Sequence, residues 1–224
     1  NAVDKCEECA EFELAKRING LAPGYLAEAA KELGAVFVHY SSDYVFDGQK
    51  AAGYKESDAV SPISNYGISK AMGEKAIQEK SSKYYVIRLQ KLFGKTVVFP
   101  AAKKSFFELM LGLAETKKEL DLVDEELANF TYAPDLADRT RYIIENNLPF
   151  GIYHIINEGR PATWFGAEKI LFELAGRNDI KLNSVPSEKF PRPAKRPKYS
   201  VLLNTKLPAL RPWDEALKEF LGRK

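Results

Sequence analysis

The strongest constraint on the fold is the order of three consecutive segments: an apolar run, a long helical pattern and a second apolar run. The first run, 35–42, is almost continuously apolar and ends in two serines, which is typical of a strand buried on both faces of a parallel sheet. A long helix is expected from about Asn65 to Lys80, and a second buried strand at 84–89. Strand, helix and strand in this order predict an α/β fold.

The flanking segments extend this alternation. A helical pattern covers 4–33, and we expect it to be interrupted at residues 19–20 and 23–24, which read Asn-Gly and Pro-Gly. The segment 186–198, rich in proline and basic residues, is expected to be a connection. The remaining predicted elements are strands at 120–123 and 151–156 and helices at 106–114, 135–145, 164–175 and 213–221.

The composition is that of a globular protein without an evident affinity for nucleic acid or membranes. Lys and Arg number 33 against 31 Asp and Glu, so the formal net charge is only +2. No apolar run approaches the roughly 20 residues of a membrane span, no signal peptide opens the chain, and two cysteines cannot form a disulfide framework. We therefore expect a cytoplasmic protein, and a first residue other than Met indicates a fragment or a processed product.

The residues that most clearly point to chemistry are Tyr66 and Lys70, four positions apart on the long helix. This spacing projects both side chains from one face, one turn apart. A phenol with its ordinary pKa of about 10 is a poor acid–base catalyst at neutral pH, but a neighbouring ammonium lowers that pKa. The pair can therefore exchange a proton with a carbonyl or an alcohol. An ordinary surface tyrosine and lysine is the alternative, and the Tyr-x-x-x-Lys match alone favours it.

The end of the first strand changes this balance. Ser41 and Ser42 lie there, and open α/β sheets bind ligands just beyond the carboxyl ends of their strands. A hydroxyl at this place can donate to the carbonyl oxygen that Tyr66 protonates. Buried strand, terminal serine and Tyr-x-x-x-Lys on the next long helix resemble the arrangement of short-chain dehydrogenases/reductases, so the whole constellation favours catalysis.

Several segments also resemble the dTDP-4-dehydrorhamnose reductase family. Segment 38–48, VHYSSDYVFDG, is similar to the family's HxSTDYVFDG, and 61–70 is similar to its PxNxYGxSK. The resemblance runs in register from residue 1 to about 222. Its other matches are AVDKCE at 2–7 with AVDKAE, TYAPDLA at 131–137, GIYH at 151–154 with GxYH, and RPKYS at 196–200 with RPxxS.

The resemblance implies a fold and a reaction. The fold is a partial Rossmann-like, doubly wound parallel sheet at 1–100, with a smaller C-terminal α/β substrate domain mainly at 101–224 and a return to the first domain at 124–146. The implied reaction is reduction of a 4-keto-6-deoxy sugar nucleotide by NADPH or NADH, as in dTDP-L-rhamnose synthesis. The sugar nucleotide is the expected partner, a homodimer is a further expectation, and no metal is expected.

The resemblance also implies roles for individual residues. Tyr66 would donate a proton to the sugar O4, and Lys70 would tune Tyr66 and hold the nicotinamide ribose. Ser42, where the family usually has Thr, would orient the keto oxygen, and Asp43 would contact the sugar. The expected catalytic residues are therefore Ser42, Tyr66 and Lys70, and the expected cofactor contacts are Ser41, Tyr66 and Lys70.

The sequence departs from the family pattern at the dinucleotide site. A Rossmann reductase holds the pyrophosphate at a Gly-rich turn between its first strand and helix. No G-x-G-x-x-G or G-x-x-G-x-x-G occurs among these 224 residues. We therefore expect most of the dinucleotide site to require a missing N-terminal segment of roughly 60 residues, the size of two βαβ units with shared strands.

A second departure lies after the second strand, where RLQKLFG at 88–94 replaces the family's RTSWVYG. Lys91 stands in place of an aromatic substrate contact, and a lysine offers charge to a phosphate or carboxylate but no stacking face. We expect Lys91 to bind substrate as a mobile point charge, with a solvated loop lysine as the alternative. In the basic run 189–198, Arg196 is the expected diphosphate ligand, with a solvated connector as the alternative.

Two other functions stay open. One is a non-catalytic, regulatory subunit, because the β subunit of methionine adenosyltransferase resembles the same family, and the other is a related sugar-nucleotide epimerase or dehydratase. Retained Ser42, Tyr66 and Lys70 favour catalysis, and the missing Gly-rich turn favours a binding role. Cys6 and Cys9 are expected to be a helical surface pair, and His39 and His154 to be packed or hydrogen-bonded core residues.

Overall fold

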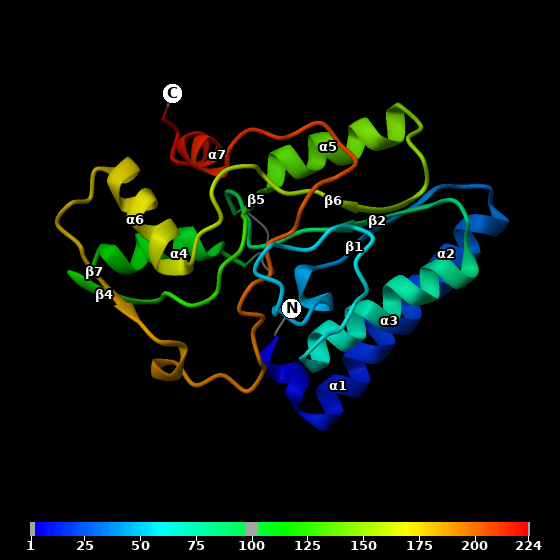
Figure 1. Ribbon diagram of the computed structural model, residues 1–224, viewed down its shortest axis with the longest axis horizontal. Helices are drawn as coiled ribbons and strands as arrows, with labels where there is room; N and C mark the ends of the chain where they lie inside the picture. The colour runs from blue at the N-terminus through cyan, green and yellow to red at the C-terminus, as the bar shows by residue number, and fades with distance from the viewer. Residues whose placement is uncertain (1–2, 97–102, 224) are drawn as a thin grey trace.

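A computed structural model describes residues 3–96 and 103–223 of the chain (Figure 1). The main sheet has three parallel strands in the order β1-β2-β6, which are Phe37–Tyr40, Tyr84–Arg88 and Gly151–His154. Parallel pairing with intervening helices confirms the predicted α/β fold. Because β2 is central, its carboxyl end lies between those of β1 and β6.

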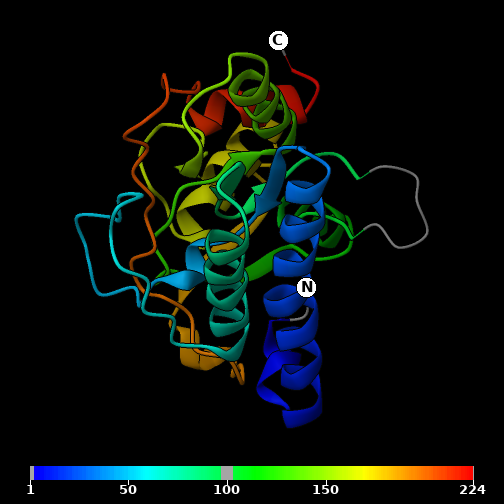
Figure 2. The ribbon, with the colours of Figure 1, turned by 90° about the vertical axis from the view of Figure 1, so that its right-hand side faces the viewer.

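Helices cover both faces of this sheet (Figure 1 and Figure 2). Helices α2 (Ala22–Glu32) and α3 (Asn65–Lys80) lie on one face, and α5 (Ala133–Glu145) lies on the other. Successive residues of β2 point to opposite layers, as the pleat requires: Val86 packs against α2 and α3, and Ile87 packs against α5. This two-sided covering is the doubly wound arrangement expected from the sequence.

The N-terminal helical segment is continuous where the sequence predicted interruptions. Its elements are a 3-10 turn at Asp4–Glu7, α1 at Cys9–Ala15, a π-helical turn at Lys16–Leu21 and then α2. The breaks expected at residues 19–20 and 23–24 are therefore wrong. Gly24 serves close packing instead, since an added Cβ would lie 2.9 Å from the Cβ of Ala76 on α3.

Strand β1 is half-buried in the described chain, not buried on both faces. It is an edge strand of the three-stranded sheet, and Val36 and Tyr40 are 42% and 43% exposed. The prediction of a fully buried strand is wrong for the residues present, because only one neighbouring strand covers β1. The adjacent helical segment also exposes large apolar side chains, namely Leu14, Ile18, Leu21, Tyr25, Leu26 and Leu33.

Two more parallel strand pairs follow the first two strands of the main sheet. β4 (Glu119–Val123) pairs with β7 (Lys181–Val185), and β3 (Leu92–Phe93) pairs with β5 (Thr131–Tyr132). The sequence predicted β4 but not the other three strands. Two-residue strands are too short to show an alternating pattern, and β7 reads KLNSV, which is mostly polar.

Three helices of this half enclose an aromatic core. They are α4 (Phe106–Ala114), α6 (Trp164–Ala175) and α7 (Trp213–Phe220), close to the predicted bounds. The expected connection 186–198 contains a short 3-10 turn, Ser187–Lys189. The large, deeply buried side chains of the core are those of Phe93, Phe107, Phe130, Leu171, Trp213 and Leu217.

The division into two domains stays a prediction. The boundary expected between residues 100 and 101 lies outside the described residues. Part of the segment 124–146 packs on the first sheet, since Leu136 and Ile143 of α5 share a cluster with Ile87. Within residues 3–96 and 103–223, no helix is long and apolar enough to cross a membrane.

Glu168 is an unusual buried residue on α6. The residue is fully buried, and neither carboxylate oxygen has a hydrogen-bond partner among the described residues. Burial raises the pKa of Glu168 to about 9, so the folded chain holds it as a neutral acid at pH 7. A carboxyl group with an ordinary pKa when unfolded and a raised pKa when folded destabilises the fold increasingly as pH rises.

We predict that Glu168→Met stabilises the fold, because an apolar side chain of similar length removes an unpartnered buried acid. The gain in free energy of unfolding should be smallest below pH 4.5 and should grow towards pH 9, reaching about 2–4 kcal/mol near pH 8. Urea unfolding of both proteins at pH 5, 7 and 8 measures it. A gain that does not increase with pH would contradict the neutral, buried state of Glu168.

Candidate active site

Helix α3 presents Tyr66 and Lys70 in its first two turns. The Ser64 hydroxyl caps the helix by accepting a hydrogen bond from the Gly67 N–H at 3.2 Å. Both functional side chains are buried, with Tyr66 8% and Lys70 6% exposed. Gly67 allows the helix to meet the loop after β1, because an added Cβ would lie 2.2 Å from the Tyr44 carbonyl oxygen.

The ammonium of Lys70 is held at the carboxyl end of β1. Its Nζ donates to the Tyr40 carbonyl at 2.6 Å and lies 3.2 Å from the Nε2 of His39. Burial lowers the pKa of Lys70 to about 8, and the nearby Glu74 carboxylate opposes that shift. Lys70 is therefore mainly charged at pH 7. The expectation that His39 is packed or hydrogen-bonded is confirmed, but its contact with Lys70 was not predicted.

Ser41, Ser42 and Asp43 form the turn that follows β1. Backbone bonds to the end of β2 place this turn: the N–H of Ser41 donates to Ile87, and that of Asp43 donates to Leu89. The Ser42 hydroxyl donates to Asp43 Oδ1 at 2.9 Å and accepts from the backbone N–H of Tyr44. The buried Ser41 hydroxyl has no hydrogen-bond partner in residues 3–96 and 103–223. The turn thus offers a free hydroxyl beside a bonded Ser–Asp pair.

The Asp43 carboxylate is buried, and burial raises its pKa. Hydrogen bonds from Ser200, Ser42 and Gln90 oppose this shift. The sequence analysis missed Gln90, which is 1% exposed and joins several segments. Its Nε2 lies 3.5 Å from Asp43 Oδ2 and donates to the hydroxyl and carbonyl oxygens of Ser200. Its Oε1 accepts from the N–H groups of Asn129 and Leu202.

The helix and the turn meet through their aromatic rings. The rings of Tyr44 and Tyr66 pack edge to face, with centroids 5.4 Å apart. Together with the contact at Gly67, this packs the first turns of α3 against the segment that carries Ser42 and Asp43. The catalytic roles of these residues stay a prediction.

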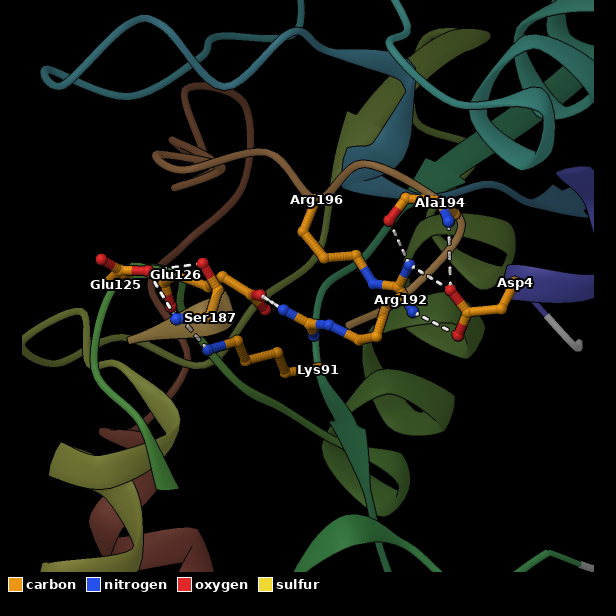
Figure 3. Close-up of polar contacts among 8 residues, drawn as sticks. All are labelled: Asp4, Lys91, Glu125, Glu126, Ser187, Arg192, Ala194 and Arg196. Atoms are coloured by element: carbon orange, nitrogen blue, oxygen red, sulfur yellow. Dashed lines mark hydrogen bonds and ion pairs between the residues drawn. The ribbon is translucent and has the colours of Figure 1, made fainter. Parts of the chain in front are cut away.

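Lys91 lies at the end of β2 in the left-handed backbone region, with φ at 32°. Its ammonium donates to the Glu126 carbonyl at 3.0 Å (Figure 3). It also donates to the Ala162 carbonyl at 3.3 Å and lies 4.4 Å from the Trp164 ring centroid. Burial lowers the pKa of Lys91 to about 7, and the charges of Glu126 and Asp43 oppose that shift. Lys91 therefore joins three segments around an aromatic ring, so a contact with substrate requires an exchange of these bonds.

Arg196 is paired within the chain (Figure 3). Its two Nη atoms donate to the two carboxylate oxygens of Asp4 at 2.8 Å each, and Nη1 also donates to the Ala194 carbonyl. Arg192 forms a similar ion pair with Glu126. Burial and the neighbouring Asp43 carboxylate raise the pKa of Tyr44, and the positive charges of Arg196 and Arg192 oppose that shift.

Arg196, Arg192 and Glu126 line a pocket of about 560 Å³. Its lining combines acidic residues after β4 with basic residues of the connection before the last helix. An adjoining apolar pocket of about 420 Å³ shares Phe190 and Arg192 with it. Among the described residues no group of three or more His, Cys, Asp or Glu side chains is placed to hold a metal ion. The thiols of Cys6 and Cys9 are free, and Cys6 is buried, contrary to the predicted surface pair.

Comparison with known proteins identifies the family of this site. A family model described as the RmlD substrate binding domain matches residues 1–224. The chain belongs to this family. The dTDP-4-dehydrorhamnose reductase of Escherichia coli is 36% identical over 235 residues, which cover 99% of the chain and 76% of the relative.

Solved structures agree with this assignment to the RmlD family. A dTDP-4-dehydrorhamnose reductase from Clostridium acetobutylicum superimposes with a TM-score of 0.91 at 37% identity, covering 99% of the chain and 77% of the other. The dTDP-4-dehydrorhamnose reductase from Bacillus anthracis, solved in complex with NADP, superimposes with a TM-score of 0.90 at 32% identity. The match covers 98% of this chain and 76% of the other. The partial Rossmann-like sheet expected from the sequence is therefore confirmed.

We predict that Asp4→Ala loosens the wall of the RmlD-family pocket, because it removes the partner of Arg196 and an acceptor for the Ala194 N–H. Amide hydrogen exchange at residues 192–198 should become about five-fold faster, and the fold should lose about 1 kcal/mol of stability. Mass spectrometry of the exchanged protein measures both the site and the rate.

The control for this variant is Glu79→Ala, which removes an exposed partner 3.8 Å from Lys75 and should leave exchange at 192–198 unchanged. Equal exchange in the Asp4→Ala and wild-type proteins would show that the ion pair does not order the pocket wall.

Proposed function

We propose that this chain carries the catalytic and sugar-nucleotide residues of an NADPH-dependent reductase. The substrate class is a 4-keto-6-deoxy sugar nucleotide, as for the dTDP-4-dehydrorhamnose reductases of its family. The observation that carries the proposal is the placement of buried Tyr66 and Lys70 against residues 39–44, the end of β1 and the turn that contains Ser42 and Asp43. Ligands of open α/β sheets bind at this end.

In this proposal Tyr66 gives its phenolic proton to the sugar O4 as the carbonyl is reduced. The charged Lys70, one turn further along α3, favours the phenolate that remains. The Ser42 hydroxyl donates to Asp43 in the described structure. When it turns to the keto oxygen, Gln90 and Ser200 still donate to the Asp43 carboxylate. The turn after β1 can therefore orient the substrate without leaving a buried charge unpartnered.

The residues at the end of β1 fit the nicotinamide end of the cofactor. The Ser41 hydroxyl is buried and unpartnered in the described chain, as expected of a group that awaits a ligand. With Tyr66 and Lys70 it would hold the nicotinamide ribose. When bound, the cofactor supplies the hydride to C4 of the sugar. Family membership and the NADP in the Bacillus anthracis structure support NADPH as the reductant.

The pyrophosphate end of the cofactor needs backbone that these residues do not provide. The Gly-rich turn is absent from the sequence, and β1 has an open edge beside exposed apolar side chains such as Leu26 and Leu33. We propose that a βαβ segment with a Gly-rich turn covers this face and completes the cofactor site. The quarter of the relatives that lies outside the match supports such a segment.

The charged pocket beside the turn is the proposed place of the nucleotide diphosphate. Arg196 and Lys91 would contribute positive charge there, after exchanging some of their present bonds with Asp4, Glu126 and Ala162. The present bonds hold both basic groups in position. A homodimer and a cytoplasmic location stay part of the proposal, and two free thiols agree with a reducing compartment.

The non-catalytic and epimerase alternatives are less well supported. A regulatory subunit needs no buried phenol and lysine beside a serine, but this chain retains all three. The structural likeness to a UDP-Glc/GlcNAc 4-epimerase from Campylobacter jejuni, with a TM-score of 0.67 at 16% identity, concerns the fold alone. The reductase relatives are closer in both sequence and structure.

We predict that Tyr66→Phe lowers turnover by about 100-fold or more, the scale of general acid catalysis. KM for the sugar nucleotide should change little, because the variant loses one hydroxyl and keeps the ring packed on Tyr44. Steady-state kinetics with NADPH and a dTDP-4-keto-6-deoxy sugar, in a form of the protein that binds the cofactor, measure the effect.

The matched control is Tyr142→Phe, which removes a hydroxyl from a tyrosine of α5 that is 39% exposed. Its turnover should equal that of the wild type. Near-normal turnover in Tyr66→Phe would end the reductase proposal.

We further predict that Lys91→Ala raises KM for the sugar nucleotide more than it lowers kcat, because it removes binding shared by the ground state and the transition state. The difference should shrink in high salt if the charge contributes at long range. Lys91→Trp should shift preference towards the dTDP-sugar of the family. Unchanged kinetics in both variants would restrict Lys91 to joining the segments at Glu126 and Ala162.

A further inference from the structure

The most informative contact outside the proposed chemistry is the one between the Lys70 ammonium and the His39 ring. The ammonium has three N–H groups, and the Tyr40 carbonyl and the His39 ring lie within hydrogen-bond distance of it. Both come from β1, whereas Lys70 belongs to α3. The lysine is therefore fixed from the strand as well as by its own helix.

We propose that His39 is a positioning residue for Lys70: its neutral imidazole accepts a hydrogen bond from the ammonium through Nε2 and holds it one helical turn from Tyr66. The proposal deepens the reductase function proposed above, because it names a group that acts only through the lysine. His39 need not touch the sugar or the cofactor.

The state of the His39 ring suits this role. Burial and the adjacent Lys70 charge lower the pKa of His39 to about 4, so the ring is neutral at pH 7. A neutral imidazole has one nitrogen that accepts and one that donates, and the 3.2 Å distance from Lys70 makes Nε2 the acceptor. The parallel ring of Phe37, two residues earlier, lies 6.3 Å away and limits rotation of the imidazole.

The state of Lys70 makes the acceptor important. The ammonium is buried, and with a pKa of about 8 it is mainly charged at pH 7 but only about one pH unit from its midpoint. Glu74 is the charged residue of α3 that favours the ammonium, but its carboxylate is bound on both oxygens by Arg88. Acceptors that bind the ammonium more strongly than the neutral amine therefore help to keep Lys70 charged beside Tyr66.

Strand geometry explains why His39 and not a neighbour has this role. Side chains alternate along β1, so His39 shares a face with Phe37 and Ser41. Phe37 packs on that face with Ile77 of α3 and Val86 of β2. His39 lies two residues nearer the carboxyl end of β1 and contacts Lys70. Lys70 lies two helical turns before Ile77 on α3. The carbonyl of Tyr40 follows directly and supplies the second acceptor.

The test uses the chain itself and needs no enzymatic activity. Nitrogen-15 NMR of the His39 ring should show an unprotonated Nε2 from pH 6 to 8. The pKa of Lys70, followed by NMR of its labelled side chain, should fall by about one unit in His39→Phe, the scale of one hydrogen bond to a charged group. His39→Gln keeps an acceptor oxygen and should restore most of the loss.

Phe37→Leu is the matched control, because it disturbs packing on the same face without removing an acceptor. Its Lys70 pKa should stay within about 0.3 unit of the wild type, well below the one-unit scale of the lost bond. A protonated Nε2 in the wild type would overturn the proposal even if His39→Phe fails to fold. Equal shifts in His39→Phe and Phe37→Leu, or no shift in either, would overturn it as well.

Kinetics then separate this proposal from the reductase function. If the chain in cofactor-binding form is active, His39→Phe should lower kcat about ten-fold with little change in the KM for the sugar nucleotide, as for one lost bond to a charged group. His39→Gln should recover it. Loss of the NMR contact with full activity would refute the role of His39 alone. An intact contact in an inactive protein would refute the reductase function alone.

Discussion

The rest of the site depends on one buried ion pair, between Arg88 at the end of β2 and Glu74 on α3. Two hydrogen bonds join them, of 2.9 Å from Nε and 2.6 Å from Nη2, and the side chains are 2% and 3% exposed. A buried pair adds little net stability, but removing one partner costs about 3–5 kcal/mol. The bidentate geometry also fixes the rotation of α3 about its axis. Tyr66 and Lys70, eight and four residues before Glu74, therefore face the end of the sheet.

The same strand end organises the substrate side. Backbone bonds from Ser41 and Asp43 to β2 hold the turn that carries the serines, and Gln90 extends from β2 to the Asp43 carboxylate and to Ser200. Lys91, one residue further, joins the segments at 126 and 162 around Trp164. Residues 87–91, the end of β2 and its extension, thus connect α3, the turn after β1 and the segments at 126 and 162. Such convergence explains why ligand sites of parallel sheets lie at this end.

Much of this arrangement could be predicted from the sequence, because its determinants are local. The bounds of α3, the strand before Ser41 and the Tyr66–Lys70 spacing follow from residue types within one segment. The sequence predictions that failed concern residues whose contact partners are distant in the sequence. The glycines of the first helical segment read as breaks, but they serve packing against α3. Gln90, the ring contact of Lys91 and the pairing of Arg196 with Asp4 join residues 39–192 positions apart, which no local pattern reveals.

We have proposed that NADPH gives a hydride to C4 of a keto sugar while Tyr66 protonates O4. The direct test is reduction of a dTDP-4-keto-6-deoxy sugar with NADPH that carries deuterium at both positions of the nicotinamide C4, in a form of the protein that binds the cofactor. We expect a product with one deuterium at the sugar C4, formed by the wild type and about 100-fold more slowly by Tyr66→Phe. Cofactor binding without deuterium transfer, or an epimerised sugar without deuterium, would contradict it.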